Sequence, residues 1–313
     1  MYMEKENQPC SICGSSVSLL YVHEKWICHE CLQITCEKLM IPWKTSLELL
    51  LKNYADACIR CRTEDDPEAV HLARVTGRKI RAILDFLGVP KMHELLLVIK
   101  KMHHSFNKVR EADVLLEEMK KESETNKVYK EIVTLVAKKR KKLQNALEKE
   151  ISSLINESFI KNGQIFIHQE LATYILPLEK EKVISEYEKH FLRQVEVYEQ
   201  TVEENGKFTA NSIKALHSVR IHSKSMRYMY HFLNETLGEK YQDKEAYYES
   251  IQNQFGDIND VQDWLFQVKT YERKIHATKN EVEHVKKNLK ARLHHLIEKV
   301  DLSQLKRQEN IVK

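Results

Sequence analysis

Two stretches of the chain carry the same row of basic residues at helical spacing, and this duplication limits the possible folds more than any other feature. In the second stretch the row is His217, Arg220, Lys224, Arg227 and His231. In the first stretch, nearly half the chain earlier, it is His71, Arg74, Arg78 and Arg81. Steps of three and four residues place each row along one side of a helix. The sequence therefore predicts two similar helices in a duplicated helical fold.

A second row of small and apolar residues accompanies each basic row. In the later stretch this row is Val219, Ser223, Met226, Tyr230 and Leu233. In the earlier stretch it is Ala73, Gly77, Ile80, Leu84 and Leu87. At about 100° per residue, these rows lie roughly on the other side of the helix from the basic rows. We expect the apolar rows to face a core.

Neither basic row is neutralised within its own helix, because residues 71–84 and 214–234 contain no Asp or Glu. Like charges three or four residues apart on a helix repel each other by about a few tenths of a kcal/mol per pair. One such row is most simply a solvated face, but its duplication favours a site for an external anion. The formal net charge of the chain is only +4, so the placement of the charges decides their function.

Glycine and proline are scarce, with seven and five residues, and residues 91–162 contain neither. Long uninterrupted helices are therefore predicted. No apolar run approaches the roughly 20 residues needed to span a bilayer. The first ten residues also lack the apolar core of a signal peptide. We expect a mostly helical, cytoplasmic protein without membrane contact.

All seven cysteines lie within the first 61 residues, which favours metal ligands over a disulfide framework. Two C-x2-C pairs separated by 14 residues have the spacing of a four-thiolate zinc site: Cys10, Cys13, Cys28 and Cys31. Between the pairs, residues 17–22 and 26–27 predict a hairpin that turns at residues 23–25. Four thiolates leave no open position for a substrate, so we expect structural zinc in a zinc-ribbon-like β module over residues 1–42.

Cys36, Cys58 and Cys61 remain outside this set. Cys58 and Cys61 form a third C-x2-C pair, but they lie at the end of a helix predicted over residues 45–61. One interpretation is a second metal site completed by a histidine such as His29. Buried thiols without a metal are the interpretation that we favour.

Other elements repeat in the same order. Long helices are predicted over residues 127–155 and 279–300, and the segments near Arg110 and Asn259 resemble each other as acidic turns. The first of these long helices carries five successive basic residues, 138–142. Because successive residues wrap around a helix, only some of the five can face one site, and we expect Arg140 to do so.

These features resemble the CHAD family, the conserved histidine α-helical domain. The first matching segment is His71-x-x-Arg74-Val-x-x-Arg78-Lys-x-Arg81, followed by Phe86-Leu87. The second is Leu216-His217-x-x-Arg220-Ile-x-x-Lys224-x-x-Arg227-Tyr228. The sequence departs from the family pattern at three positions: Ala82, Glu111 and Ser225. The resemblance covers roughly residues 45–303.

The resemblance implies an all-α fold of two pseudo-twofold-related four-helix bundles around a basic groove. The first repeat would span about residues 45–157 and the second about residues 163–303. It also implies that the groove binds inorganic polyphosphate. With the basic rows, it predicts these binding residues: His71, Arg74, Arg78, Lys79, Arg81, Arg140, His217, Arg220, Lys224, Arg227 and Tyr228.

We expect binding without catalysis. The chain has neither a glycine loop that would cradle a nucleotide nor the E-x-E-x-K motif of the triphosphate-tunnel domain that is often fused to this family. One alternative is a nucleic-acid-binding or scaffold protein, because Tyr228 and Tyr230 accompany the second row. Another is a phosphate-ester or polyphosphate-processing enzyme, whose candidate metal ligands are Glu111, Asp113, Asp260 and Asp263. For these carboxylates we favour pairing with arginines or capping of helices.

Overall fold

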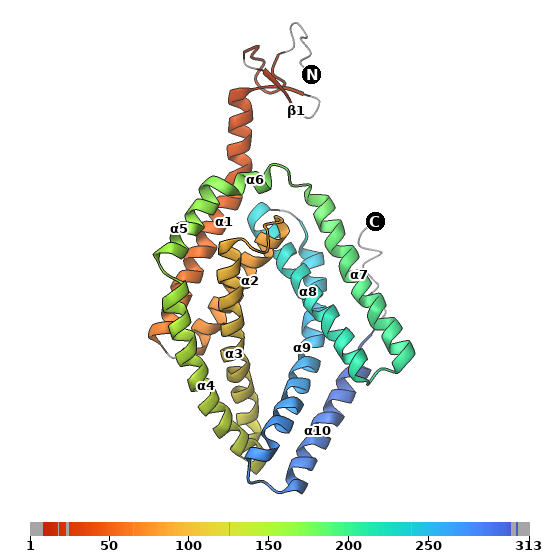
Figure 1. The fold of residues 1–313 in the computed structure, drawn as a ribbon. Helices are drawn as coiled ribbons and strands as arrows, with labels where there is room; N and C mark the ends of the chain where they lie inside the picture. Colours follow the sequence, from red (N-terminus) through yellow and green to blue (C-terminus); the bar gives the residue numbers. More distant parts are fainter. Residues whose placement is uncertain are drawn as a thin grey trace.

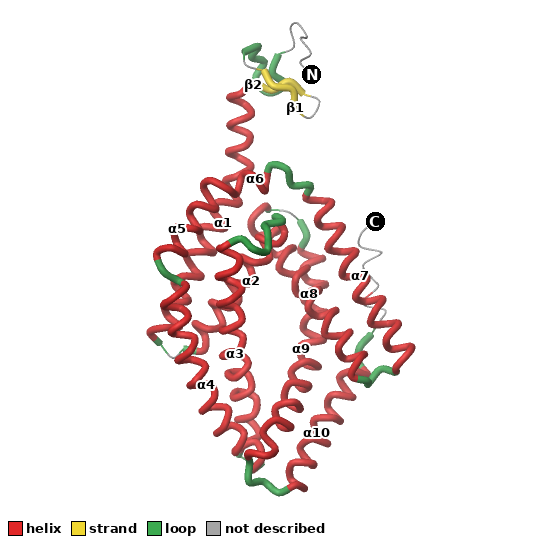
Figure 2. The backbone as a smooth tube through the Cα atoms, in the orientation of Figure 1, coloured by secondary structure: helices red, strands yellow, loops and turns green. Residues whose placement is uncertain are grey.

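The structure is a computed structural model that describes residues 9–17, 19–22, 25–64, 66–124, 126–238, 240–301 and 305. Helices dominate it, and a two-stranded hairpin precedes them (Figure 2). The helices of the first repeat are α1 (His29–Thr63), α2 (Pro67–Phe86), α3 (Glu94–Ser123) and α4 (Lys127–Leu154). Those of the second repeat are α7 (Lys180–Asn205), α8 (Ala210–Leu237), α9 (Gln242–Tyr271) and α10 (Lys279–Glu298). The predicted all-α fold of two four-helix repeats is confirmed.

A short helical segment connects the two repeats. It consists of α5 (Glu157–Ile165), a π-helical turn (Phe166–Glu170) and α6 (Leu171–Ile175). A 3-10 turn, Glu272–Lys274, follows α9. Figure 1 shows the two repeats meeting where α2 packs against α8 and diverging along α3 and α9. The repeats approach each other again where α4 contacts α10, so the molecule has the outline of a closed frame.

Local sequence signals define the ends of the two basic helices. Helix α2 begins after Asp66, whose side chain accepts a hydrogen bond from the amide of Glu68, and Pro67 occupies the first turn. Helix α8 begins after Thr209, whose hydroxyl accepts from the amide of Ser212. It ends at Gly238, which adopts a left-handed conformation with φ of 65°. These caps fix where each basic row starts relative to its core-facing row.

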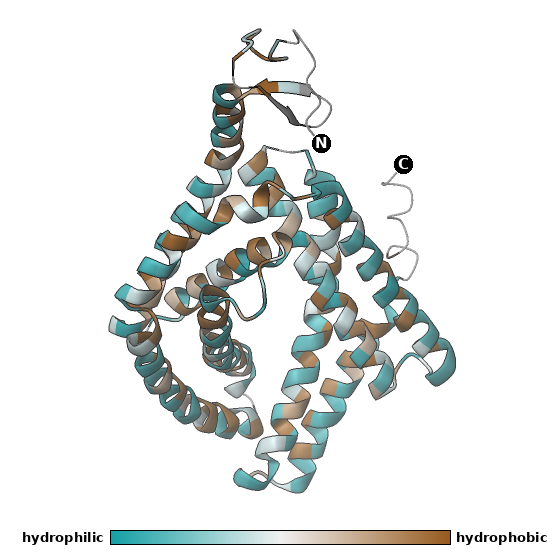
Figure 3. Ribbon diagram, turned by 45° about the horizontal axis from the view of Figure 1, so that its top comes forward, coloured by the Kyte–Doolittle hydropathy of each residue, from teal (hydrophilic) through white to brown (hydrophobic). Residues whose placement is uncertain are grey.

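Both predicted core-facing rows are buried. All five residues of the α8 row and all five of the α2 row belong to the interior. Figure 3 shows hydrophobic and hydrophilic residues interleaved along the long helices, as expected for helices that bury one side. Trp43 of α1 joins the repeats, because its ring lies 6.4 Å from that of Phe86 on α2 and 4.9 Å from that of Phe232 on α8, measured between centroids.

Two expectations about helix boundaries were wrong. Helix α1 starts at His29 rather than near residue 45 and runs through Pro42, because Met40, Trp43 and Leu47 are buried on both sides of the proline. The segments near Arg110 and Asn259, predicted as acidic turns, lie in the middle of α3 and α9. Acidic residues in these segments line a space between helices instead of ending them.

The N-terminal hairpin pairs β1 (Leu19–Val22) with β2 (Lys25–Cys28) in antiparallel register, with Leu19 opposite Cys28. The hairpin stands at the N-terminal end of α1, away from the two repeats (Figure 1). The predicted turn at residues 23–25 falls largely outside the described residues, since residues 23 and 24 are not described. In the described part of the chain, no helix is long and apolar enough to cross a membrane.

Candidate anion-binding site

A cavity of about 800 Å³ lies between the two repeats. Side chains from α2, α3, α8 and α9 form most of its lining, and α7 contributes Tyr187. Six basic residues face this space: Arg74, Arg78, Arg81, Arg110, Arg220 and Lys224. The α2–α8 contact therefore brings the two basic rows, which are far apart in sequence, to one site.

The structure brings seven of the eleven predicted binding residues together in the cavity lining: Arg74, Arg78, Arg81, His217, Arg220, Lys224 and Tyr228. The other four, His71, Lys79, Arg140 and Arg227, are not part of that lining. His71 is partly buried on α2. The members of each row diverge because a stripe with steps of three and four residues covers a wide face of the helix.

Lys79 and Arg227 are engaged by other helices. The ammonium group of Lys79 lies 3.1 Å from Nε2 of His231, and Nδ1 of the same histidine lies 2.8 Å from Oε1 of Glu245. Arg227 donates to Gln252 at 3.1 Å and forms an ion pair with Glu249 at 3.2 Å. These contacts tie α8 to α2 and α9, which makes them part of the frame around the cavity.

Arg140 is buried in the first repeat, where its Nε donates to Oδ1 of Asp113 at 2.8 Å. This ion pair joins α4 to α3. Asp113 therefore has the arginine partner that we expected for it. Tyr230 is also directed into the core, and its hydroxyl donates to Glu188. Tyr230 thus cannot stack on a ligand in the cavity, whereas Tyr228 lies in the lining.

The six Arg and Lys side chains of the cavity form no close ion pairs with the neighbouring carboxylates that the structure describes. Among the described residues, no ion pair within 4.0 Å involves any of the six. Nε and Nη1 of Arg74 and Nε of Arg220 are buried without a hydrogen-bond partner in that part of the structure. A buried polar group without a partner costs about 1–3 kcal/mol. Such donors are well suited to an anion that enters the cavity.

The electrostatic environment of the cavity disfavours positive charge on several of its side chains. Burial, followed by repulsion from Arg78, Arg220 and Arg227, lowers the pKa of Lys224 to about 7. Burial also lowers the pKa of Arg220 and, with the nearby Arg78, that of His103 to about 3. His103 is therefore neutral near pH 7, and its Nδ1 is buried without a partner in the described structure.

Sequence reasoning missed part of the lining, including His103, Asn107 and Arg110 of α3. It also gave no position in the cavity to Asp260 and Asp263 of α9. The sequence shows that the segments around Arg110 and Asn259 resemble each other, but their acidic pattern predicts turns. A helical interpretation would have placed Asn107, Arg110 and Glu111, and likewise Asn259, Asp260 and Asp263, on one side of each helix.

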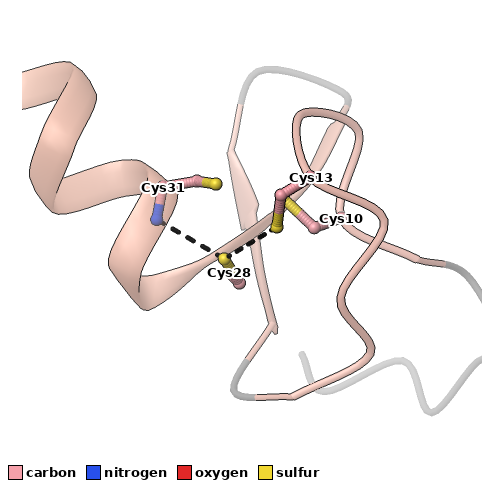
Figure 4. A group of neighbouring side chains, drawn as sticks. All are labelled: Cys10, Cys13, Cys28 and Cys31. Atoms are coloured by element: carbon pink, nitrogen blue, oxygen red, sulfur yellow. Dashed lines mark hydrogen bonds between the residues drawn. The ribbon is translucent and has the colours of Figure 1, made fainter.

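The four predicted metal ligands, Cys10, Cys13, Cys28 and Cys31, lie together with their sulfur atoms all within 4.8 Å of one another (Figure 4). Sγ of Cys28 lies 3.6 Å from Sγ of Cys13 and accepts a hydrogen bond from the amide of Cys31 at 3.4 Å. The strand β2 and the first turn of α1 hold the second pair, and the loop before β1 holds the first. Four thiols at this spacing can hold a metal ion.

Cys58 and Cys61 are completely buried in the helical core. Burial raises the pKa of the Cys58 thiol and, together with Asp66, raises that of Cys61 to about 12, so both remain protonated. Among the described residues, the N-terminal four cysteines are the only group of three or more potential ligands close enough to hold a metal ion. Both thiols are thus buried, as the favoured interpretation expected for this pair.

A duplicated all-α protein with a cationic cavity between its repeats is the class that the fold and the site define. The CHAD domain model matches residues 45–265, more than half of the chain, and the chain belongs to this family. A crystal structure of the CHAD domain from the plant Ricinus communis is similar, with a TM-score of 0.55 and 15% identity over 84% of this chain and 93% of that chain. No curated protein matches the chain.

Proposed function

We propose that the cavity binds inorganic polyphosphate. The observation that carries this proposal is that cationic rows from two repeats line one cavity without close ion pairs to the carboxylates of the described residues. CHAD domains are associated in general with polyphosphate binding. A linear chain of phosphates offers oxygen atoms along its whole length, which suits arginine forks and lysine charges arranged along two helices.

The proposed activity is binding without turnover. Phosphoryl transfer normally requires metal ions on the phosphates and a residue that positions the nucleophile. The carboxylates of the cavity do not form a close group of three or more potential metal ligands within the described residues. The cavity accordingly has the character of an electrostatic binding site.

Single-stranded nucleic acid is the second candidate ligand. Tyr228, Trp264 and Phe266 line the cavity beside the cations, and aromatic rings next to a basic groove provide stacking platforms for bases. Arg292 already covers Trp264 at 4.9 Å, measured to the ring centroid, whereas 63% of the Phe266 surface is exposed. A comparison of ligands at equal phosphate concentration separates the two candidates.

We expect long polyphosphate to bind far more tightly than triphosphate, because only a long chain contacts the α2 and α8 rows together. Oligonucleotide should bind more weakly than polyphosphate and should be displaced by it. Calorimetric titrations of the three ligands, at two salt concentrations, provide the measurement. Equal affinity for triphosphate and long chains would contradict a ligand shared by both repeats, and preferential binding of oligonucleotide would favour the second candidate.

For the N-terminal cysteine cluster we propose structural zinc. Zinc prefers a closed tetrahedral shell in structural sites, and four cysteine thiolates supply it. The hairpin contributes only a small separate apolar cluster around the cysteines, with Leu19 and Ile27 packed against it. So small a unit gains much of its folding free energy from a bound metal.

Replacing one ligand, in Cys28→Ser, should abolish stoichiometric zinc while leaving the helical repeats folded. The cluster around Met40, Trp43 and Leu47 is separate from the cysteine cluster, so the core does not depend on the metal. Metal analysis of the purified protein and its circular dichroism measure the two effects. Cys36→Ser is the matched control, and retention of wild-type zinc by Cys28→Ser would show that the ligand set is wrong.

A further inference from the structure

The cavity also contains carboxylates, which the proposed ligand does not require. Asp85 of α2 lies in the lining near the end of one basic row. Glu111 of α3 and Asp260 and Asp263 of α9 also line the cavity, on helices that carry no basic row. The charge of Glu111 raises the pKa of Asp263, and the charges of Asp263 and Asp257 raise that of Asp260. The three residues Glu111, Asp260 and Asp263 form what we call the acidic wall.

The acidic wall forms no close ion pair with the basic rows and acts on them only from a distance. Among the described residues, none of its carboxylates has an ion-pair partner within 4.0 Å, although Asp260 favours the charged forms of Arg220 and Lys224 from a greater distance. Burial is the largest cause of the raised pKa values of all three groups. Glu111 and Asp263 nevertheless keep exposed surface inside the cavity, so water can solvate them.

A polyanion site would bind anions more tightly with Asn or Gln at these positions, because like charges facing a ligand are repulsive. Carboxylates in a site for polyanions are better explained by discrimination against an unwanted ligand than by attraction of the wanted one. The aromatic side chains beside these carboxylates indicate that the excluded ligand is single-stranded nucleic acid. Phe266 and Trp264 lie on the same helix as Asp260 and Asp263, and a base stacked there would cover these carboxylates.

We propose that the acidic wall determines specificity, by excluding polyanions that carry bulky side groups from a cavity that admits a bare phosphate chain. This inference rests on the proposed polyphosphate function. A bare chain along α2 and α8 leaves the carboxylates of α9 in water. A nucleic acid strand whose phosphates contact the same rows must place its sugars and bases toward α9, where they displace water from unpaired charges. Removing water from an unpaired carboxylate is strongly unfavourable.

The test compares the wild-type protein with the Asp260→Asn, Asp263→Asn double variant. Its ligands are long polyphosphate, oligothymidylate and oligodeoxycytidylate, used in EDTA at pH 8 so that divalent cations are absent and the carboxylates are charged. The double variant should bind oligothymidylate at least about tenfold more tightly, with a smaller gain for polyphosphate, since an uncompensated charge no longer loses its water. The preference for polyphosphate should therefore decrease.

Asp257→Asn is the control, because it removes one carboxylate charge from an exposed position of α9 that does not line the cavity. It should change the affinities for both ligands equally and only slightly. An unchanged preference in the double variant would overturn the proposal. So would weaker binding of oligodeoxycytidylate, because that would show the carboxylates accepting hydrogen bonds from base amino groups.

The experiment distinguishes an error in the role of the acidic wall from an error in the proposed polyphosphate binding. If the wild-type protein binds no polyphosphate, the proposed function is wrong whatever the double variant does. If it binds polyphosphate and the double variant gains no oligothymidylate affinity, only the role of the acidic wall is wrong. Circular dichroism should show an unchanged fold, because asparagine at 263 can still accept the hydrogen bond that Asn259 donates to Asp263 at 2.9 Å.

Discussion

Arg78→Ala and Arg220→Ala should each weaken polyphosphate binding by about 1–3 kcal/mol, which is roughly a 5- to 150-fold loss of affinity. The two arginines belong to different repeats and line the same cavity. Each can donate to phosphate oxygens through a fork of parallel N–H groups, and such charged hydrogen bonds are about twice as strong as neutral ones. A ligand that spans both rows must lose affinity in both variants.

The salt dependence of binding should change with the affinity. Each phosphate that a protein cation neutralises releases counterions, and for nucleic acids this gives a log–log slope of about −0.7 to −0.9 per phosphate. Each variant should therefore flatten the slope for polyphosphate by roughly that amount. Titrations at four or five salt concentrations measure it. A loss of affinity with an unchanged slope would mean that the arginine shapes the cavity and does not contact phosphate.

Arg227→Ala is the matched control for these variants. It removes an arginine from the same face of α8, but the guanidinium of Arg227 contacts Gln252 and Glu249 of α9 and does not line the cavity. The affinity of this variant for polyphosphate should stay within about threefold of the wild type, because Gln252 and Glu249 hold the guanidinium on α9 and a partly exposed ion pair contributes only about 0–1 kcal/mol. If only the variants of one repeat lose affinity, a ligand shared between the repeats is contradicted.

The sequence predicts the two central helices well because both of their faces carry a signal. Asp66 and Thr209 mark their beginnings, and the apolar rows through Ile80 and Met226 repeat with the period of a helix. A buried face and an exposed face follow from that period alone. Juxtaposition of the two basic faces then follows once α2 packs against α8.

Other features depend on contacts that the local pattern does not contain. Arg140 is one of five successive basic residues, and its position is decided by Asp113, 27 residues earlier in the chain. The passage of α1 through Pro42 depends on the burial of Trp43 between the two repeats. The acidic wall is likewise invisible until α3 and α9 face each other across the cavity. Periodicity assigns a face to a residue, whereas its partner is set by tertiary packing.

Polyphosphate affinity should fall as the pH rises above about 7, and Lys224 should be the main cause. Burial and the neighbouring Arg78, Arg220 and Arg227 lower the pKa of this lysine to about 7 in the free protein, while Asp260 acts in the opposite direction. A bound polyanion favours the charged ammonium and raises this pKa. Below about pH 6 Lys224 is already charged, so binding requires no proton. Above pH 7 the neutral lysine must take up a proton from solution when the ligand binds.

The size of the effect follows from proton linkage. Each pH unit above the free-state pKa makes protonation of Lys224 about 1.4 kcal/mol less favourable, so affinity should decrease by up to roughly tenfold per unit until the bound-state pKa is reached. Calorimetry at pH 8 in two buffers with different ionisation enthalpies measures the proton uptake directly. At pH 8, Lys224 of the wild-type protein should take up close to one proton for each protein molecule that binds polyphosphate.

Lys224→Arg separates this lysine from the other titrating groups of the cavity. Arginine stays charged throughout this range, so the variant should lose most of the decrease between pH 7 and pH 9 and most of the proton uptake. His217 and the acidic wall are present in both proteins, so their contributions to the pH dependence cancel when the two are compared. His103, with a pKa of about 3, stays neutral throughout this range. If the affinity of Lys224→Arg falls with rising pH as steeply as that of the wild type, another group causes the pH dependence. Lys224 would then not contact the phosphate chain.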